Sequence, residues 1–313
     1  MKNFAKLIKL TLLVATSTVM FSCSDDDNVA PESNTIAAIA SRNPNFTTLV
    51  AALDRAGLVQ TLDQNGPFTV FAPTNAAFND FLADNGFTSL NDIPVDVLRE
   101  VLLNHVVNGT NLSTSLSTGY VKTLGKGSAS DSNTLSMFIN TASGVRLNGV
   151  ASVTTADIVA SNGVIHVVDA VIGLPTVVTH AAANPGFSTL VSLLTQQNLV
   201  STLDGTASSP FTVFAPNNDA FTTFETQNPG VLASLTSAQV TAVLTYHVVA
   251  GANVLSTGIP ATPITTFETG TFTIAGTTIT DESDRQTGII ATDVQASNGV
   301  IHVVNNVLLP TFD

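Results

Sequence analysis

The feature that most constrains this chain is an eight-residue segment that occurs twice. Ser161–Val168 and Ser297–Val304 both read SNGVIHVV. Three more segments repeat in the same order: residues 43–50 match 184–191, the heptapeptide PFTVFAP at 67–73 returns at 210–216, and HVV at 105–107 returns at 247–249. A period of about 140 residues is the size of a whole domain and far too long for a solenoid unit. The chain is therefore predicted to be a tandem duplication.

Each copy mixes helix and strand signals. Phe46, Leu49, Val50 and Leu53 have the spacing of one helix face, and the second copy repeats this stripe. The FTVFAP segments read as short strands that stop at Pro73 and Pro216. Beyond them, the Thr74-Asn75 and Asn217-Asn218 pairs offer side-chain oxygens that can cap a following helix. Further helices are expected over 95–101 and 238–244, each leading into a His-Val-Val segment.

The last third of each copy reads as β structure, and the octamer itself is predicted to lie in a hairpin. Residues 157–160 and 164–168 flank Ser161-Asn162-Gly163, and Asn-Gly favours the positive φ angles of a type I′ turn. Strand alternation places Val164, His166 and Val168 on one face and the two residues between them on the other. Because both faces are apolar, this strand is expected to be central and mostly buried.

The N-terminus has the composition of a targeting segment. Lys2, Lys6 and Lys9 precede an apolar run from 10 to 21 that is too short to span a bilayer. Cys23, the only cysteine, follows Ser22 and precedes an acidic run, which resembles the cleavage site and surface-export signal of lipoproteins in the Bacteroidetes. Residues 1–22 are thus expected to be a signal peptide, with lipidated Cys23 and a tether over 23–33. The membrane is then a partner through the acyl chains, since two or three chains anchor durably. The expected location is the outer membrane, with the protein exposed at the cell surface.

Charge argues against nucleic acid as a partner. Only 11% of the residues are charged, and the formal net charge is −13. Cleavage before Cys23 would remove three lysines and make the chain still more acidic. Such a chain repels phosphate backbones, and no basic cluster is visible in the sequence.

The repeated motifs resemble the fasciclin-like domain family. FTVFAPTNAAF (68–78) and FTVFAPNNDAF (211–221) are each followed by a His-Val-Val segment and then by GVIHVVDAVI or GVIHVVNNVL. The resemblance covers nearly all of 34–311, so fasciclin-like domains are expected over 34–175 and 176–313. It implies an α+β fold in which each domain is a β-sandwich or wedge of about seven strands carrying a cluster of helices. It also implies an extracellular protein that acts in adhesion or in contact with a matrix.

Four of the five histidines fall in the repeated motifs, which raises the question of a metal or catalytic site. Zinc would need three or four ligands, yet the copies share no cysteine and offer no acid at matched spacing. A triad of Ser161, His166 and Asp169 fails in the second copy, where Asn305 replaces the acid. We therefore expect no enzyme, no metal and no cofactor. The motif residues are interpreted as mainly structural: Phe71, Pro73, Asn75, His105, His166, Asp169, Phe214, Pro216, Asn218, Tyr246, His247 and His302.

One pair is also considered as a binding surface. In animal members of the family, a Tyr-His pair flanked by aliphatic residues is associated with receptor adhesion. Tyr246-His247 carries this pair in the second copy, whereas the first copy has Asn104-His105. The pair is expected to be mainly structural, with a contribution to binding left open.

These observations favour a non-enzymatic surface lipoprotein that mediates adhesion or contact with matrix or biofilm through an unknown protein or glycan ligand. The alternative is a glycan- or nutrient-binding component of a surface uptake system. The scarcity of sugar-stacking side chains, with no Trp and only two Tyr, favours adhesion over this alternative.

Overall fold

A computed structural model describes residues 33–312 of the chain. Residues Asn34–Asp313 form one compact unit. The expected signal peptide, Cys23 and most of the tether lie outside the described residues. Within the described range, no helix is both long enough and apolar enough to cross a membrane.

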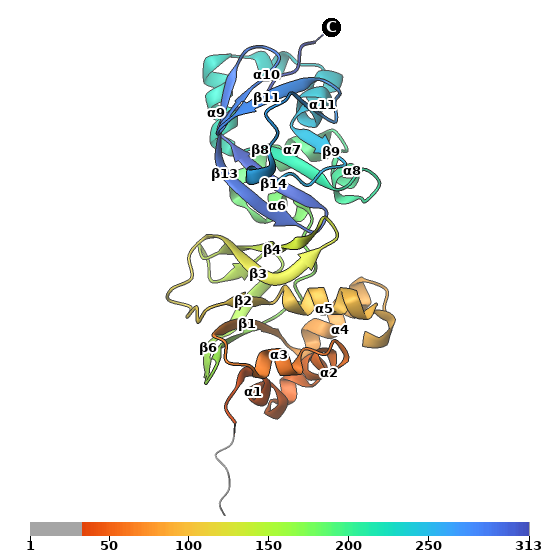
Figure 1. Cartoon of the computed structure of the whole chain (residues 1–313), viewed down its shortest axis with the longest axis vertical. Helices are drawn as coiled ribbons and strands as arrows, with labels where there is room; N and C mark the ends of the chain where they lie inside the picture. The colour runs from red at the N-terminus through yellow and green to blue at the C-terminus, as the bar shows by residue number, and fades with distance from the viewer. Residues whose placement is uncertain (1–32, 313) are drawn as a thin grey trace, which may run out of the picture. The chain divides into compact units, whose positions relative to one another are not determined.

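The first copy begins with helices and continues with strands (Figure 1). Its helices are α1 (Ile36–Arg42), α2 (Thr47–Arg55), α3 (Val59–Asp63), α4 (Asn75–Asp84) and α5 (Val95–Leu103), with 3₁₀ turns at Pro44–Phe46 and Leu90–Asp92. Its strands are β1 (Phe68–Pro73), β2 (Val106–Asn108), β3 (Gly119–Gly127), β4 (Ser130–Asn140), β5 (Arg146–Leu147), β6 (Ala151–Ala160) and β7 (Gly163–Val168).

The second copy repeats this order with shorter strands in its middle part. Its helices are α6 (Val177–Ala183), α7 (Ser188–Gln196), α8 (Val200–Asp204), α9 (Asn218–Gln227), α10 (Val231–Ser234) and α11 (Ser237–Tyr246), with 3₁₀ turns at Pro185–Phe187 and Ser256–Gly258. Its strands are β8 (Phe211–Pro216), β9 (Val248–Ala250), β10 (Ile264–Thr265), β11 (Thr271–Ala275), β12 (Thr278–Thr280), β13 (Gln286–Ala296) and β14 (Gly299–Val304).

The expectation of two α+β domains with about seven strands each is confirmed, and the structure adds how the strands join. In the first copy the seven strands close into a barrel, because β2 pairs with β3 through Val107 and Thr123. In the second copy the seven strands form a sheet in the order β10-β11-β12-β13-β14-β8-β9, with β9 and β10 at its two edges. In both copies the repeated octamer strand is central, lying parallel to the FTVFAP strand and antiparallel to β6 or β13.

The hairpin is where predicted, but its turn is not of type I′. Ala160 pairs with Gly163, so the two turn residues are Ser161 and Asn162, and neither has a positive φ. Gly163 has a φ of +152° and lies against β1, where a Cβ atom would overlap the carbonyl oxygen of Phe68. The glycine is therefore required by the close approach of a neighbouring strand.

Asn162 in turn ties the hairpin to the helices. Its side-chain oxygen accepts a hydrogen bond from the N–H of Ile36 at 2.9 Å, at the start of α1, and its amide nitrogen donates to Leu62 O at 2.8 Å. Asn298 makes the matching bonds to Val177 N and Leu203 O.

Each copy has an apolar core between its helices and its sheet, and a second apolar cluster on the other face of the same strands.

Candidate functional site

His105 and His247 each connect a helix, α5 or α11, to the segment that follows the octamer strand. Both rings are buried. In each, Nδ1 lies 2.7 Å from the carbonyl oxygen four residues earlier, on α5 or α11. Nε2 accepts a hydrogen bond at 2.9 Å from a backbone N–H that follows the octamer strand, that of Ile172 or Leu308. Because Nε2 accepts, the neutral ring carries its proton on Nδ1. Burial lowers the pKa of each ring to about 4, against the hydrogen bond to the helix carbonyl, which raises it.

His166 and His302 lie on the central strands with their rings stacked on Phe71 and Phe214. The ring centroids are 5.4 and 5.3 Å apart. Nε2 of His166 donates to the carbonyl oxygen of Asn111 at 2.9 Å, and Nε2 of His302 donates to that of Val254 at the same distance. Both rings are fully buried. They hold the loop after β2 or β9 against the sheet.

An aspartate and a serine complete this anchor in both copies, and sequence reasoning missed them. Asp157 accepts hydrogen bonds from the N–H and hydroxyl of Ser113 at 2.8 and 2.5 Å, and Asp293 accepts the same pair from Ser256. The bonds from Ser113 lower the pKa of Asp157. Both aspartates sit at a bulge and have positive φ angles, +63° for Asp157 and +62° for Asp293. The signal lay in the repeat itself, because Leu-Ser-Thr recurs at 112–114 and 255–257.

Asp169 and Asn305 play the same role in the two copies, that of a side-chain oxygen accepting from a backbone N–H. Asp169 Oδ1 accepts from Ser152 N at 2.6 Å, and Asn305 Oδ1 accepts from Gly288 N at 2.8 Å. The site needs an oxygen acceptor and no charge, which explains why the acid is replaced in the second copy. Asp169 is directed to this backbone group and Ser161 lies in the hairpin turn, so the imagined triad with His166 is not assembled.

Asn75 and Asn218 join two helices rather than capping their own. Asn75 Oδ1 accepts from Thr48 N in the first turn of α2 at 2.9 Å, and its amide nitrogen donates to Pro44 O. Asn218 does the same for α7 through Thr189 N and Pro185 O. The caps of α4 and α9 are the preceding residues, Thr74 and Asn217. Pro73 and Pro216 end their strands in buried positions, as the sequence predicts.

Tyr246 is fully buried and His247 is 3% exposed. The Tyr246 hydroxyl donates to Thr271 O at 2.6 Å and accepts from Glu282 N at 3.2 Å, and burial raises the pKa of this hydroxyl. The ring also packs edge-on against Phe272. In this conformation the pair presents almost no surface to a partner. Its contribution to binding stays a prediction, and the burial of both side chains argues against it.

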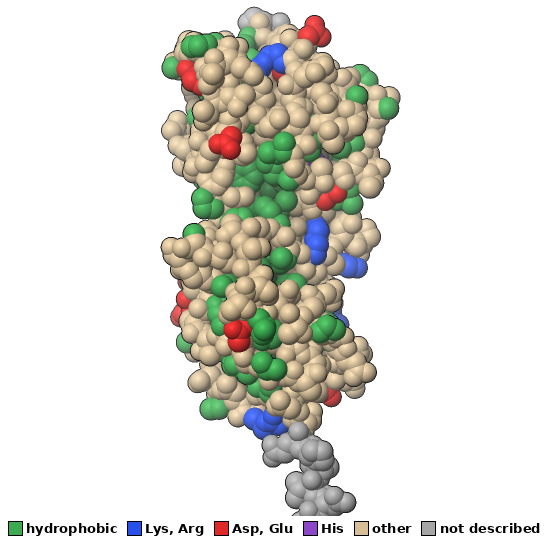
Figure 2. Space-filling model, turned by 90° about the vertical axis from the view of Figure 1, so that its left-hand side faces the viewer, with side chains coloured by type: hydrophobic (Ala, Val, Ile, Leu, Met, Phe, Trp, Pro, Cys, Tyr) green, Lys and Arg blue, Asp and Glu red, His purple; other side chains and the backbone are tan. Residues whose placement is uncertain are grey.

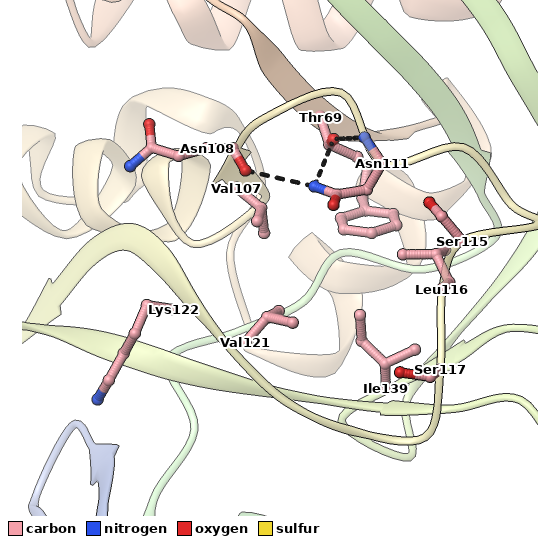
Figure 3. Close-up of a pocket in the computed structure, with 11 residues that line it drawn as sticks. Thr69, Val107, Asn108, Asn111, Ser115, Leu116, Ser117, Val121, Lys122 and Ile139 are labelled. Atoms are coloured by element: carbon pink, nitrogen blue, oxygen red, sulfur yellow. Dashed lines mark hydrogen bonds between the residues drawn. The ribbon is translucent and has the colours of Figure 1, made fainter.

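The first copy has a pocket of about 500 Å³ beside the loop after β2 (Figure 3). Its apolar side chains are Phe71, Val107, Leu116, Val121 and Ile139, and its polar ones are Thr69, Asn108, Asn111, Ser115, Ser117 and Lys122. Figure 3 shows Asn111 held by hydrogen bonds to Thr69 and Asn108, while the Lys122 side chain extends away from the other labelled residues. Across residues 33–312, no group of three or more His, Cys, Asp or Glu side chains is placed to hold a metal.

Comparison with known proteins gives one consistent result. The family model described as "Fasciclin domain" matches residues 44–175 and again 185–310. Protein sll1483 of Synechocystis is 41% identical over 138 residues, which cover 44% of this chain and 72% of that protein. Human periostin is 28% identical over 277 residues, covering 84% of this chain and 31% of periostin.

Among solved structures, a FAS1 domain pair from the insect cell adhesion molecule fasciclin I matches with a TM-score of 0.48 and 21% identity, over 83% of this chain and 92% of that one. The two family matches take up most of the chain and fall on the two copies of the duplication. The chain therefore belongs to the fasciclin domain family and carries two fasciclin domains in tandem.

Proposed function

We propose that this protein is a non-enzymatic adhesion protein of a bacterial outer surface, held there by acyl chains on Cys23. The observation that carries the proposal is the combination of two fasciclin domains with a lipoprotein-type N-terminus. Fasciclin domains are associated with cell adhesion and extracellular proteins, and the family is generally non-enzymatic. Tandem copies on one tether raise the effective concentration of weak contacts.

The surface chemistry supports weak, uncharged contacts. Charged side chains are few and scattered over the face shown in Figure 2, and most of that face is neither charged nor apolar. The histidines of the repeated motifs are buried and bonded to backbone groups, which supports a scaffold role for them rather than a catalytic one.

Two measurements on cells test the proposal. Cys23→Ala should abolish incorporation of labelled palmitate and release the protein from the membrane fraction, whereas the neighbouring control Ser24→Ala should change neither. A deletion strain should attach less to a matrix-coated surface, and wild-type protein should restore attachment better than Cys23→Ala. Attachment that is unchanged by deletion, or membrane retention of Cys23→Ala, would contradict the proposal.

A second candidate function is capture of a glycan or nutrient. The pocket of the first copy favours it, because its volume of about 500 Å³ is within the range of small-ligand sites. Titration of the purified protein with candidate ligands tests this second function, whereas attachment assays on cells test adhesion.

A further inference from the structure

The pocket of the first copy is built on a rigid frame. The Thr69 hydroxyl donates to Gly109 O at 2.6 Å and accepts from Asn111 N at 2.9 Å, which fixes the start of the loop after β2. Asp157 holds the same loop through Ser113, and His166 holds it through Asn111 O. A preformed site of this kind loses little conformational freedom when a ligand binds.

Within this frame, two polar groups face the pocket with unused hydrogen-bonding capacity. The Asn111 amide nitrogen donates to Thr69 Oγ1 at 3.0 Å and to Asn108 O at 3.3 Å, so the orientation of the amide is fixed and its oxygen is left as an acceptor. Among the described residues, neither this oxygen nor the Ser117 hydroxyl has a hydrogen-bond partner, and both residues line the pocket. The pocket thus offers one oriented acceptor and one hydroxyl beside an apolar floor.

The pocket presents no free charge. Among the described residues that line it, none is acidic and one is basic, Lys122, which is engaged elsewhere. Nζ of Lys122 donates to Asp293 O at 2.8 Å and to Ser136 Oγ at 3.2 Å. A charged ligand would lose its hydration without gaining an ionic partner, which favours a neutral one.

The second copy serves as an internal control for what the fold requires. The frame is kept there: Thr212 replaces Thr69, with Ser256, Asp293 and His302 in the anchoring roles. The polar rim of the first copy, formed by Asn111 and Ser117, is not kept. Val254 takes the place of Asn111, since its N–H donates to Thr212 Oγ1 at 2.9 Å, and by the same spacing Pro260 takes the place of Ser117. The amide and hydroxyl of the first copy are therefore not needed to build a fasciclin domain.

We propose that this pocket binds the terminal part of a neutral oligosaccharide. A sugar ring has an apolar C–H face, which the floor formed by Val107, Val121 and Ile139 would contact. It also has hydroxyl groups that can donate to Asn111 Oδ1 and pair with Ser117 Oγ. A plain hydrocarbon would bury these two groups without a partner, which costs free energy. This inference deepens the second candidate function, glycan capture, and does not depend on adhesion or on the anchor.

The test is an NMR titration of residues 24–313, which include the whole compact unit, with neutral disaccharides (maltose, cellobiose, mannobiose, xylobiose) as probes. Digalacturonate and octanoate serve as the anionic and hydrocarbon comparisons. At least one neutral disaccharide should bind saturably at millimolar concentration and shift the amide signals of Thr69, Asn111 and Ser117. The amide signals of Thr212 and Val254, the equivalent positions of the second copy, should not move.

Substitutions decide whether the polar rim carries the binding. Ser117→Ala should weaken binding by about three- to tenfold, and Asn111→Val, the residue found in the second copy, by about tenfold or more. The matched control Pro260→Ala should leave the affinity unchanged. Stronger binding of digalacturonate or octanoate, or no binding by any neutral disaccharide, would overturn the proposal. The proposal would also be overturned if Ser117→Ala and Asn111→Val each bound the sugar with the affinity of the wild type. The two proposals can fail separately, because the adhesion proposal is tested on cells and the sugar-binding proposal is tested on purified protein.

Discussion

His105 and His247 make the same two hydrogen bonds in the two copies, with equal distances of 2.7 Å to a helix carbonyl and 2.9 Å from a backbone N–H. Each ring bridges the end of a helix to the segment that leaves the central strand. This bridge needs one ring nitrogen as a donor and the other as an acceptor, which the neutral imidazole supplies and the protonated ring, with two donors, does not.

Replacing His105 or His247 by Ala should destabilise the copy that contains it. The change leaves a buried carbonyl and a buried N–H unpaired, and each such group costs about 1–3 kcal/mol. Urea unfolding followed by circular dichroism measures the loss, and hydrogen exchange by mass spectrometry assigns it to one copy. Gln60→Ala, at an exposed position, is the control. A variant as stable as the wild type would contradict the bridging role.

Stability should fall as the pH drops from 6.5 towards 4. Burial lowers the pKa of His105, His180 and His247 from 6.5 to about 4. The unfolded chain therefore binds more protons than the folded one in this window, so the stabilisation is complete above pH 6.5 and is lost as the pH falls through the window. The loss is about 3 kcal/mol for each histidine by pH 4.

Urea unfolding at pH 7.5, 6 and 5 checks this pH dependence. In His247→Gln, whose side chain does not titrate, stability should depend less steeply on pH than in the wild type. Asp92, Asp157 and Glu282 add little to the pH dependence above about pH 5, because hydrogen bonds lower their pKa values and they stay charged in this range. Equal stability at pH 7.5 and 5 would show that the rings are not held neutral.

His166→Ala should lower the melting temperature by releasing the loop after β2. The variant loses the ring stacked on Phe71 and the hydrogen bond to Asn111 O. A loss of about 1–4 kcal/mol is expected from the vacated volume and the unpaired carbonyl. Differential scanning calorimetry measures it, and His302→Ala provides the matching change in the second copy. Unchanged melting in both variants would refute a structural role for these rings.

Asp169→Asn should be nearly neutral, whereas Asp169→Ala should be destabilising by about 1 kcal/mol. The reason is that Asn305 already performs the same bond in the second copy with a neutral oxygen. Thermal unfolding of the two variants separates the need for an acceptor from a need for charge. If Asp169→Asn lost as much stability as Asp169→Ala, the carboxylate charge would matter and the equivalence of the two residues would be wrong.

The sequence predicts the helices around Phe46 and Val95, the FTVFAP strand and the central octamer strand, because each has a local apolar pattern that appears twice. It does not predict the anchor of Asp157, whose partner Ser113 is 44 positions away and meets it only because a bulge turns the aspartate at positive φ. The pocket escaped prediction for a related reason. Its rim differs between the copies, and reasoning from the repeat directs attention to what the copies share.

Gly163→Ala should strongly lower the free energy of unfolding, although it adds only one methyl group. A Cβ at this position would overlap the carbonyl oxygen of Phe68 on the parallel strand β1, and φ at +152° is itself unfavourable for alanine. The added methyl can be accommodated only by separating two paired strands of the barrel, so a loss of more than about 2 kcal/mol is expected. Gly173→Ala is the control, since a Cβ there would contact no atom within 4 Å. Chemical denaturation of the two variants decides the matter. If Gly163→Ala proved as stable as Gly173→Ala, the glycine would be a turn residue, as the Asn-Gly pattern first indicated, and the close approach of β1 to β7 would not be what requires it.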